Sequence, residues 1–121
     1  MKKKLLIVDD QEMYHMSLAV ALKKYFTITT VDNQADAIKA LREDYDLALI
    51  DIRLDEMDEK NVDGLKILEW IKINQPNTLA FMMSAYTEFS YAEKSLNLGA
   101  RHFFRKPIDI VSLVTILQEK G

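Results

Sequence analysis

In the segment Leu5-Leu6-Ile7-Val8-Asp9-Asp10, four apolar residues lead directly into two adjacent aspartates. A second apolar run, Leu47-Ala48-Leu49-Ile50, leads into Asp51. Short continuous apolar runs of this kind are typical of strands that are buried on both faces of a parallel sheet. Ligands of open parallel sheets bind where the carboxyl ends of the strands meet. The two segments therefore predict an acidic site at that edge.

Further runs of the same character alternate with segments that have helical spacing. We expect strands at residues 5–8, 27–31, 47–50, 79–83 and 102–104. We expect helices that include Tyr14, Leu18, Ala21, Leu22 and Tyr25; Ala37, Ile38, Leu41 and Tyr45; Leu65, Leu68, Ile71 and Lys72; Glu88 to Leu98; and the segment after Pro107. Five strands and five helices in alternation predict an α/β fold with a doubly wound parallel sheet, since a barrel would need eight such units.

The composition describes one ordinary globular domain over residues 1–121, with 49% hydrophobic and 29% charged residues. The chain has no cysteine, which excludes disulfides and thiolate zinc sites. Its formal net charge of -3 argues against nucleic-acid binding by this domain alone. The apolar run after Lys2-Lys3-Lys4 is too short for a signal peptide or a membrane span, so we expect a cytoplasmic protein without a membrane segment.

Asp9, Asp10 and Asp51 are candidate metal ligands. If the strands that precede them are neighbours, the strand ends lie about 5 Å apart. Carboxylates this close repel one another, and a cation relieves the repulsion. Mg2+ suits the site, because it binds one or two carboxylates together with waters and phosphate oxygens. Helix capping is an equally good explanation for Asp9 or Asp10 alone, but it accounts less well for Asp51.

Ser84 and Lys106 follow the fourth and fifth predicted strands, so we expect their side chains at the same edge of the sheet. A lysine there neutralises negative charge and binds a phosphoryl oxygen as a point charge. A single serine or lysine at a strand end is usually just solvated. Five matching positions on four strand ends together predict an acidic pocket that handles phosphate.

The motifs, in this order and spacing, resemble those of bacterial two-component response-regulator receiver domains, the family of the chemotaxis regulator. The resemblance covers essentially the whole chain. It is carried by Leu5-Leu6-Ile7-Val8-Asp9-Asp10, Leu49-Ile50-Asp51-Ile52-Arg53-Leu54, Asp63-Gly64, Met83-Ser84-Ala85, Leu98-Gly99-Ala100 and Phe104-Arg105-Lys106-Pro107. It implies a flavodoxin-like fold with five parallel strands in the order 2-1-3-4-5.

The resemblance also implies the role of each acidic residue. Asp51 corresponds to the phosphoacceptor. Asp10, Asp51 and the backbone carbonyl of Arg53 correspond to direct ligands of Mg2+ (or Mn2+). Asp9 corresponds to a residue that acts on the metal mostly through water.

The remaining roles concern the phosphoryl group. By the same resemblance, Lys106 would contact its oxygens, and Ser84 would donate its hydroxyl to it and move toward it. Phe103 matches the aromatic switch residue that turns inward as the serine moves. Lys106-Pro107 matches a peptide bond that is usually cis in the family. Ala85 is small, which would leave access for an attacking water.

The implied function is a phosphoacceptor switch in a two-component phosphorelay, and not a turnover enzyme. A phosphohistidine on a sensor kinase or a phosphotransfer protein, or a small acyl phosphate, would supply the phosphoryl group. The fourth helix, fifth strand and fifth helix would form an output and homodimer surface, which includes Tyr91, Ser95, Arg101 and Phe103. The alternatives are a receiver-like scaffold that is not phosphorylated, against which the intact pocket argues, and an enzyme, for which the chain lacks a glycine-rich phosphate loop.

Residues 55–62 depart from the family pattern, because they lengthen the segment between Asp51 and Asp63 and add acidic residues. We expect a solvated acidic lid. The alternative is that these acids alter metal affinity or the choice of kinase. A calcium loop is excluded, since Trp70 stands where that motif requires an acid.

Two histidines and one apolar stripe lie outside the acidic pocket in this interpretation. We expect His15 at the surface of the first helix and His102 at the start of the fifth strand, and neither histidine has a partner at metal-ligand spacing. The first helix also carries the stripe. Met13, Met16 and Val20 form a second apolar stripe on this helix. We favour the margin of the core for this stripe over a docking site for a partner.

Overall fold

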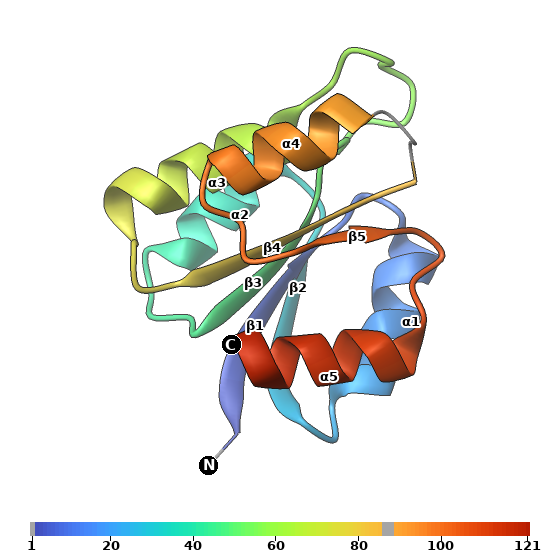
Figure 1. Ribbon diagram of the computed structural model, residues 1–121, viewed down its shortest axis with the longest axis vertical. Coiled ribbons are helices and arrows are strands. Elements are labelled where there is room, and N and C mark those ends of the chain that lie inside the picture. The colour runs from blue at the N-terminus through green and yellow to red at the C-terminus, as the bar shows by residue number, and fades with distance from the viewer. Residues whose placement is uncertain (1, 86–88) are drawn as a thin grey trace.

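Five parallel strands form one sheet with the order β2-β1-β3-β4-β5 (Figure 1). The computed structural model describes residues 2–85 and 89–121. The strands are β1 (Lys3–Val8), β2 (Phe26–Val31), β3 (Leu47–Asp51), β4 (Leu79–Ser84) and β5 (Phe103–Arg105), and the helices are α1 (Glu12–Leu22), α2 (Gln34–Leu41), α3 (Asp63–Asn74), α4 (Phe89–Asn97) and α5 (Ile110–Lys120). Within the described residues no helix is both long enough and apolar enough to cross a membrane. The predicted doubly wound fold and its strand order are confirmed.

Helices α2, α3 and α4 cover one face of the sheet, and α1 and α5 cover the other (Figure 1). Successive residues of β1 therefore enter different clusters. Leu6 and Val8 pack on the side of α2 and α3, whereas Leu5 and Ile7 pack on the side of α1 and α5. All four side chains are fully buried. This two-sided burial explains why the strand reads as a continuous apolar run and not as an alternating one.

The register of the sheet brings the polar strand ends to one edge. Val8 pairs with Ile50, Asp51 with Met83, and Ser84 with Arg105. The residues that end or directly follow β1, β3, β4 and β5 are therefore neighbours in space. The candidate site lies at this carboxyl edge, between the two helical layers.

Several predicted element ends are wrong. Helix α2 ends at Leu41, so Tyr45 lies beyond it. Helix α1 ends at Leu22, so Tyr25 lies beyond the helix and is 37% exposed. Strand β5 begins at Phe103, one residue later than predicted, although the carbonyl of His102 already accepts a hydrogen bond from the amide of Met82 at 3.0 Å. The predicted start of α4 at position 88 lies outside the described residues.

Tyr91 and Ser95 face the core. We had predicted that both residues belong to the output surface. Tyr91 is 8% exposed and Ser95 is fully buried. The hydroxyl of Ser95 donates to the carbonyl of Tyr91 at 2.7 Å. Residues four apart share one face of a helix, and in α4 that face packs on the sheet. Leu96 and Arg101, in contrast, are exposed.

Gly64 allows α3 to begin directly against the end of β3. Its amide donates to the carbonyl of Ile52 at 2.9 Å. A Cβ atom at Gly64 would overlap the carbonyl of Asp51 and would lie 2.7 Å from the Cα of Ile52. Both neighbours are backbone atoms, which cannot move aside as a flexible side chain would. Gly64 therefore sets how closely α3 approaches the candidate site.

We expect Gly64→Ala to lower the free energy of unfolding by about 3 kcal/mol, because overpacking against the backbone outweighs the gain in helix propensity. In an unconstrained helix the same change stabilises the helix by about 1 kcal/mol, so the sign of the change in stability tests the packing at Gly64.

Gly99→Ala is the matched control. Gly99 has a φ of +94°, and a Cβ added there would meet none of the described residues within 4 Å. Backbone strain alone therefore predicts a loss of about 1–2 kcal/mol for Gly99→Ala. Urea denaturation measures both variants, and a Gly64→Ala protein as stable as the wild type would contradict the packing argument.

Candidate functional site

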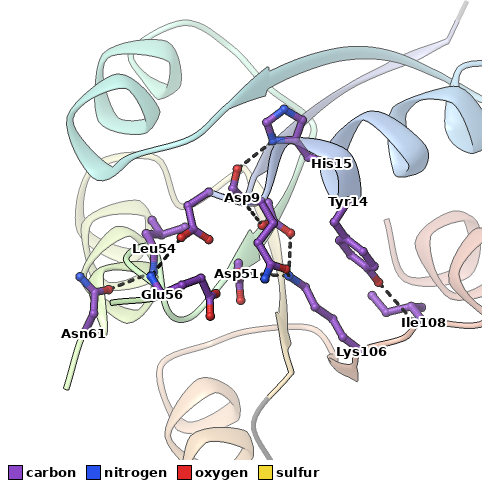
Figure 2. A network of polar contacts seen from close by, with 11 residues as sticks. Asp9, Tyr14, His15, Asp51, Leu54, Glu56, Asn61, Lys106 and Ile108 are labelled. Carbon is purple, nitrogen blue, oxygen red and sulfur yellow. Dashed lines mark hydrogen bonds and ion pairs between the residues drawn. The ribbon is translucent and has the colours of Figure 1, made fainter. Parts of the chain in front are cut away.

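Three carboxylates converge at the carboxyl edge of the sheet (Figure 2). Asp9 and Asp10 follow β1, and Asp51 is the last residue of β3. Each contributes a carboxylate oxygen to a group whose atoms all lie within 4.8 Å of one another. Asp9 is fully buried, Asp51 is 2% exposed, and Asp10 is partly exposed. The structure thus brings together the three acids that the sequence placed at strand ends.

Lys106 lies among these carboxylates (Figure 2). Its ammonium donates to Oδ2 of Asp9 at 2.7 Å and to Oδ2 of Asp51 at 3.1 Å. A third, longer contact joins it to Oε1 of Gln11 at 3.4 Å. The side chain is 6% exposed. Lys106 therefore neutralises part of the negative charge from inside the protein and not from its surface.

The other predicted residues lie near this edge or behind it. Ser84 is fully buried at the end of β4, and its carbonyl accepts a hydrogen bond from the amide of Lys106 at 2.9 Å. The Lys106-Pro107 peptide bond is cis, as the resemblance implied. Phe103 is partly buried against the core cluster on the side of α3 and α4. Arg53 is 9% exposed in the segment after β3.

Residues 55–62 are largely exposed, as expected, but one backbone amide of this loop reaches the site. The amide of Glu56 donates to Oδ2 of Asp10 at 3.2 Å. The side chain of Asn61 holds the loop in place, because its Oδ1 accepts from the backbone amides of Leu54 and Asp63 at 3.0 Å each. Sequence reasoning did not predict this contact, since a backbone amide leaves no mark in the sequence.

His15 is buried, and its predicted place at the surface is wrong. The residue is 8% exposed, and its Nδ1 donates to the backbone carbonyl of Asp9 at 2.8 Å (Figure 2). The spacing from His15 to Leu18 and Leu22 is three and then four residues, which places all three on one helical face. That spacing could have predicted the burial of His15.

The comparisons with known proteins agree with this geometry. The family model of the response regulator receiver domain matches residues 5–118. The chain belongs to this family. A receiver domain is a signalling domain of two-component systems, so the predicted role as a phosphoacceptor switch fits the family.

Individual relatives extend the match. The chain is 33% identical to sporulation initiation phosphotransferase F of Bacillus subtilis over 112 residues. The aligned region covers 91% of this chain and 86% of that protein. The chain is also 32% identical over 117 residues to the transcriptional regulatory protein ZraR of Klebsiella oxytoca, covering 95% of this chain. This chain spans only 25% of the length of ZraR. The crystal structure of a CheY-like receiver domain protein from Methanospirillum hungatei JF-1 superposes with a TM-score of 0.88 at 26% identity, over 99% of this chain and 94% of that one.

Burial has the largest influence on the pKa values of two acids in the pocket of this receiver domain, Asp51 and Asp10. It raises the pKa of Asp51 to about 7; the charge of Lys106 acts in the opposite direction, and Asp9 and Asp10 raise the pKa further. The pKa of Asp10 is also raised, first by burial and then by the charges of Glu56 and Asp9. Burial alone would lower the pKa of Lys106, but the adjacent carboxylates outweigh it and raise that pKa. The pocket therefore carries more negative charge than one lysine can balance.

The receiver pocket fits a hard divalent cation. Oδ1 of Asp10 is buried and, among the residues that the structure describes, it has no hydrogen-bond partner. Buried carboxylate oxygens are otherwise almost always paired. Two further carboxylates lie within 4.8 Å of Asp10, and oxygen donors of this kind are the ligands that such cations prefer.

The raised pKa of Asp51 predicts a pH-dependent stability in the absence of metal. In the unfolded chain Asp51 titrates near its ordinary pKa of 3.8, and in the fold its pKa is about 7. Between these values the folded state binds the proton more tightly, so stability falls as the pH rises from about 4 to about 7. Relative to Asp51→Asn, which lacks this titration, we expect the wild type to lose on the order of 2–4 kcal/mol over that range.

Urea denaturation in EDTA at several pH values measures this difference. Asp44→Asn, which removes an exposed carboxylate far from the site, is the control and should follow the wild type. Parallel stability curves for the wild type and Asp51→Asn would show that Asp51 titrates normally in the fold.

Proposed function

We propose that Asp51 is the phosphoacceptor of this receiver domain. The observation that carries the proposal is the position of its carboxylate, at the end of β3, between two further acids and the ammonium of Lys106. Phosphoryl transfer requires positioning and neutralisation of charge more than covalent help from the protein. The end of β3 positions the Asp51 carboxylate, and the ammonium of Lys106 neutralises negative charge beside it.

The reaction is a displacement at phosphorus. An oxygen of the Asp51 carboxylate attacks and forms a new P–O bond, while the bond from phosphorus to the donor breaks and its electron pair leaves with the donor. The donor is a phosphohistidine of a sensor kinase or of a phosphotransfer protein, or a small acyl phosphate. Asp51 is only 2% exposed and Lys106 contacts its Oδ2. Lys106 must therefore exchange this contact for the incoming phosphoryl oxygens, while its ion pair with Asp9 at 2.7 Å retains it in the pocket.

Asp10, Asp51 and the backbone carbonyl of Arg53 would hold Mg2+ or Mn2+ directly, with Asp9 acting through water. When bound, such a cation neutralises the charge on the phosphoryl oxygens. The buried Oδ1 of Asp10 supports this assignment. The amide of Glu56 donates to the other oxygen of Asp10 at 3.2 Å, so Oδ1 is the oxygen that would be free to bind the cation.

Ser84 and Phe103 would transmit the signal. The hydroxyl of Ser84 would move to the phosphoryl group, and Phe103, which is partly buried, would turn further inward. This shift between two populations would change the surface of α4, β5 and α5, where the chain would pair with a second copy or with an output partner. The domain would act in the cytoplasm, without nucleic-acid binding of its own and without turnover as an enzyme.

Incubation with acetyl phosphate and Mg2+ is expected to add one phosphoryl group to the wild-type protein, as measured by mass spectrometry of the intact chain. Asp51→Asn should show no gain, because its amide is not a nucleophile. Asp44→Asn, which makes the same change at an exposed position distant from the pocket, is the matched control and should be phosphorylated. A wild type that gains nothing from acetyl phosphate, phosphoramidate or a phosphorylated kinase would refute the proposal.

Removal of one predicted ligand should weaken metal binding. We expect Asp10→Asn to reduce the affinity for Mg2+ by about ten-fold or more in a calorimetric titration, a size of effect known for weakened metal shells. Asp44→Asn removes the same charge from a distant exposed position and should bind as the wild type does. Equal affinities in Asp10→Asn and the wild type would place the cation elsewhere.

A further inference from the structure

The ring of Tyr14 covers the ammonium of Lys106. The Nζ atom lies 4.3 Å from the centroid of the ring (Figure 2), well within the range of a cation–π interaction. The other contacts of this ammonium are to oxygens of Asp9, Asp51 and Gln11. Within the described part of the chain, Tyr14 thus places an aromatic ring beside an ammonium that also contacts three polar side chains.

The hydroxyl of Tyr14 makes a second connection to the same segment. It accepts a hydrogen bond from the backbone amide of Ile108 at 3.3 Å (Figure 2). Tyr14 and Ile108 both pack against the apolar cluster on the side of α1 and α5. Tyr14 therefore joins the first turn of α1 to the chain just beyond Lys106-Pro107. Burial raises the pKa of Tyr14, so the phenol stays neutral at physiological pH.

We propose that Tyr14 is a positioning residue for Lys106, which holds the ammonium in place while it transfers from the Asp51 carboxylate to the incoming phosphoryl oxygens. This inference rests on the proposed phosphorylation of Asp51. During the exchange Lys106 gives up its 3.1 Å contact with Asp51, but its contacts with Asp9 and with the ring of Tyr14 do not depend on that oxygen. The ring thus limits how far the long lysine side chain disorders.

A tyrosine at helical spacing is ordinarily a core residue, and an aliphatic side chain would fill the same space. The distinguishing property is the electron-rich face of the ring, which attracts a cation where a leucine does not. The hydroxyl adds a tether to Ile108 that phenylalanine lacks. The hydroxyl can therefore be removed while the ring is kept, and the ring and hydroxyl can be removed together.

The experiment measures the rate of phosphorylation with acetyl phosphate and Mg2+ for three variants. We expect Tyr14→Leu, which lacks both ring and hydroxyl, to react about three- to ten-fold more slowly, the range that a partly buried cation–π contact represents. Tyr14→Phe keeps the ring and should fall between Tyr14→Leu and the wild type. Tyr25→Leu is the matched control, because it removes a contact of the same type with Lys24, 5.7 Å from the ring and outside the pocket, and it should react as the wild type does.

A double-mutant cycle separates positioning from a general structural role. In the background of Lys106→Met, the change Tyr14→Leu should have no further effect on the rate. If the two losses instead multiply, or if Tyr14→Leu reacts as fast as the wild type, Tyr14 does not act through Lys106 and the inference is overturned.

NMR provides a test that does not depend on phosphorylation. It also does not depend on whether the Tyr14→Leu variant folds. In the wild type and in Tyr14→Phe, the ring should shift the Hε protons of Lys106 upfield of those of the other lysines and give cross-peaks to them. Normal shifts without cross-peaks would overturn the inference. If these signals are present but the wild type is not phosphorylated, the proposed function fails while the contact between Tyr14 and Lys106 stands.

Discussion

The charge balance at the carboxyl edge of the sheet is the constraint on which the rest of this receiver domain depends. Three carboxylates lie within 4.8 Å of one another, and one buried ammonium contacts two of them. Buried charge that is not fully paired is costly. Part of that cost is avoided by the raised pKa of Asp51, and a bound cation would remove the remainder. The electrostatic cost of this cluster and its affinity for a cation therefore have one physical origin.

A separate contact holds each charged group of the pocket in position. The ring of His15 supports the backbone of Asp9, the amide of Glu56 supports the carboxylate of Asp10, Gly64 brings α3 against the backbone of Asp51, and Tyr14 covers Lys106. A group that must exchange partners during phosphoryl transfer needs surroundings that stay fixed. These neighbours provide that rigidity.

Several features were predictable because they depend on local patterns. The fully buried strands β1 and β3 appear in the sequence as continuous apolar runs, and the acids that follow them mark the strand ends. The faces of the helices were less predictable. His15 was placed at the surface and Tyr91 on the output face, yet both are 8% exposed. Apolar spacing identifies the buried stripe of a helix, but a polar or amphipathic side chain at its margin becomes buried only when a partner accepts its polar atom.

The fold class, the strand order (through the resemblance to the receiver family) and the acids, serine and lysine at the strand ends could be predicted from the amino-acid sequence. Each of these follows from residue type and spacing along the chain. Three features became visible in the folded chain alone. Oδ1 of Asp10 has no partner among the described residues, the amide of Glu56 contacts the other oxygen of Asp10, and the ring of Tyr14 covers Lys106. Those contacts join segments up to 92 positions apart, as 106 − 14 = 92 for Tyr14 and Lys106. They depend on the packing of α1 and the loops against the sheet, which no local pattern specifies.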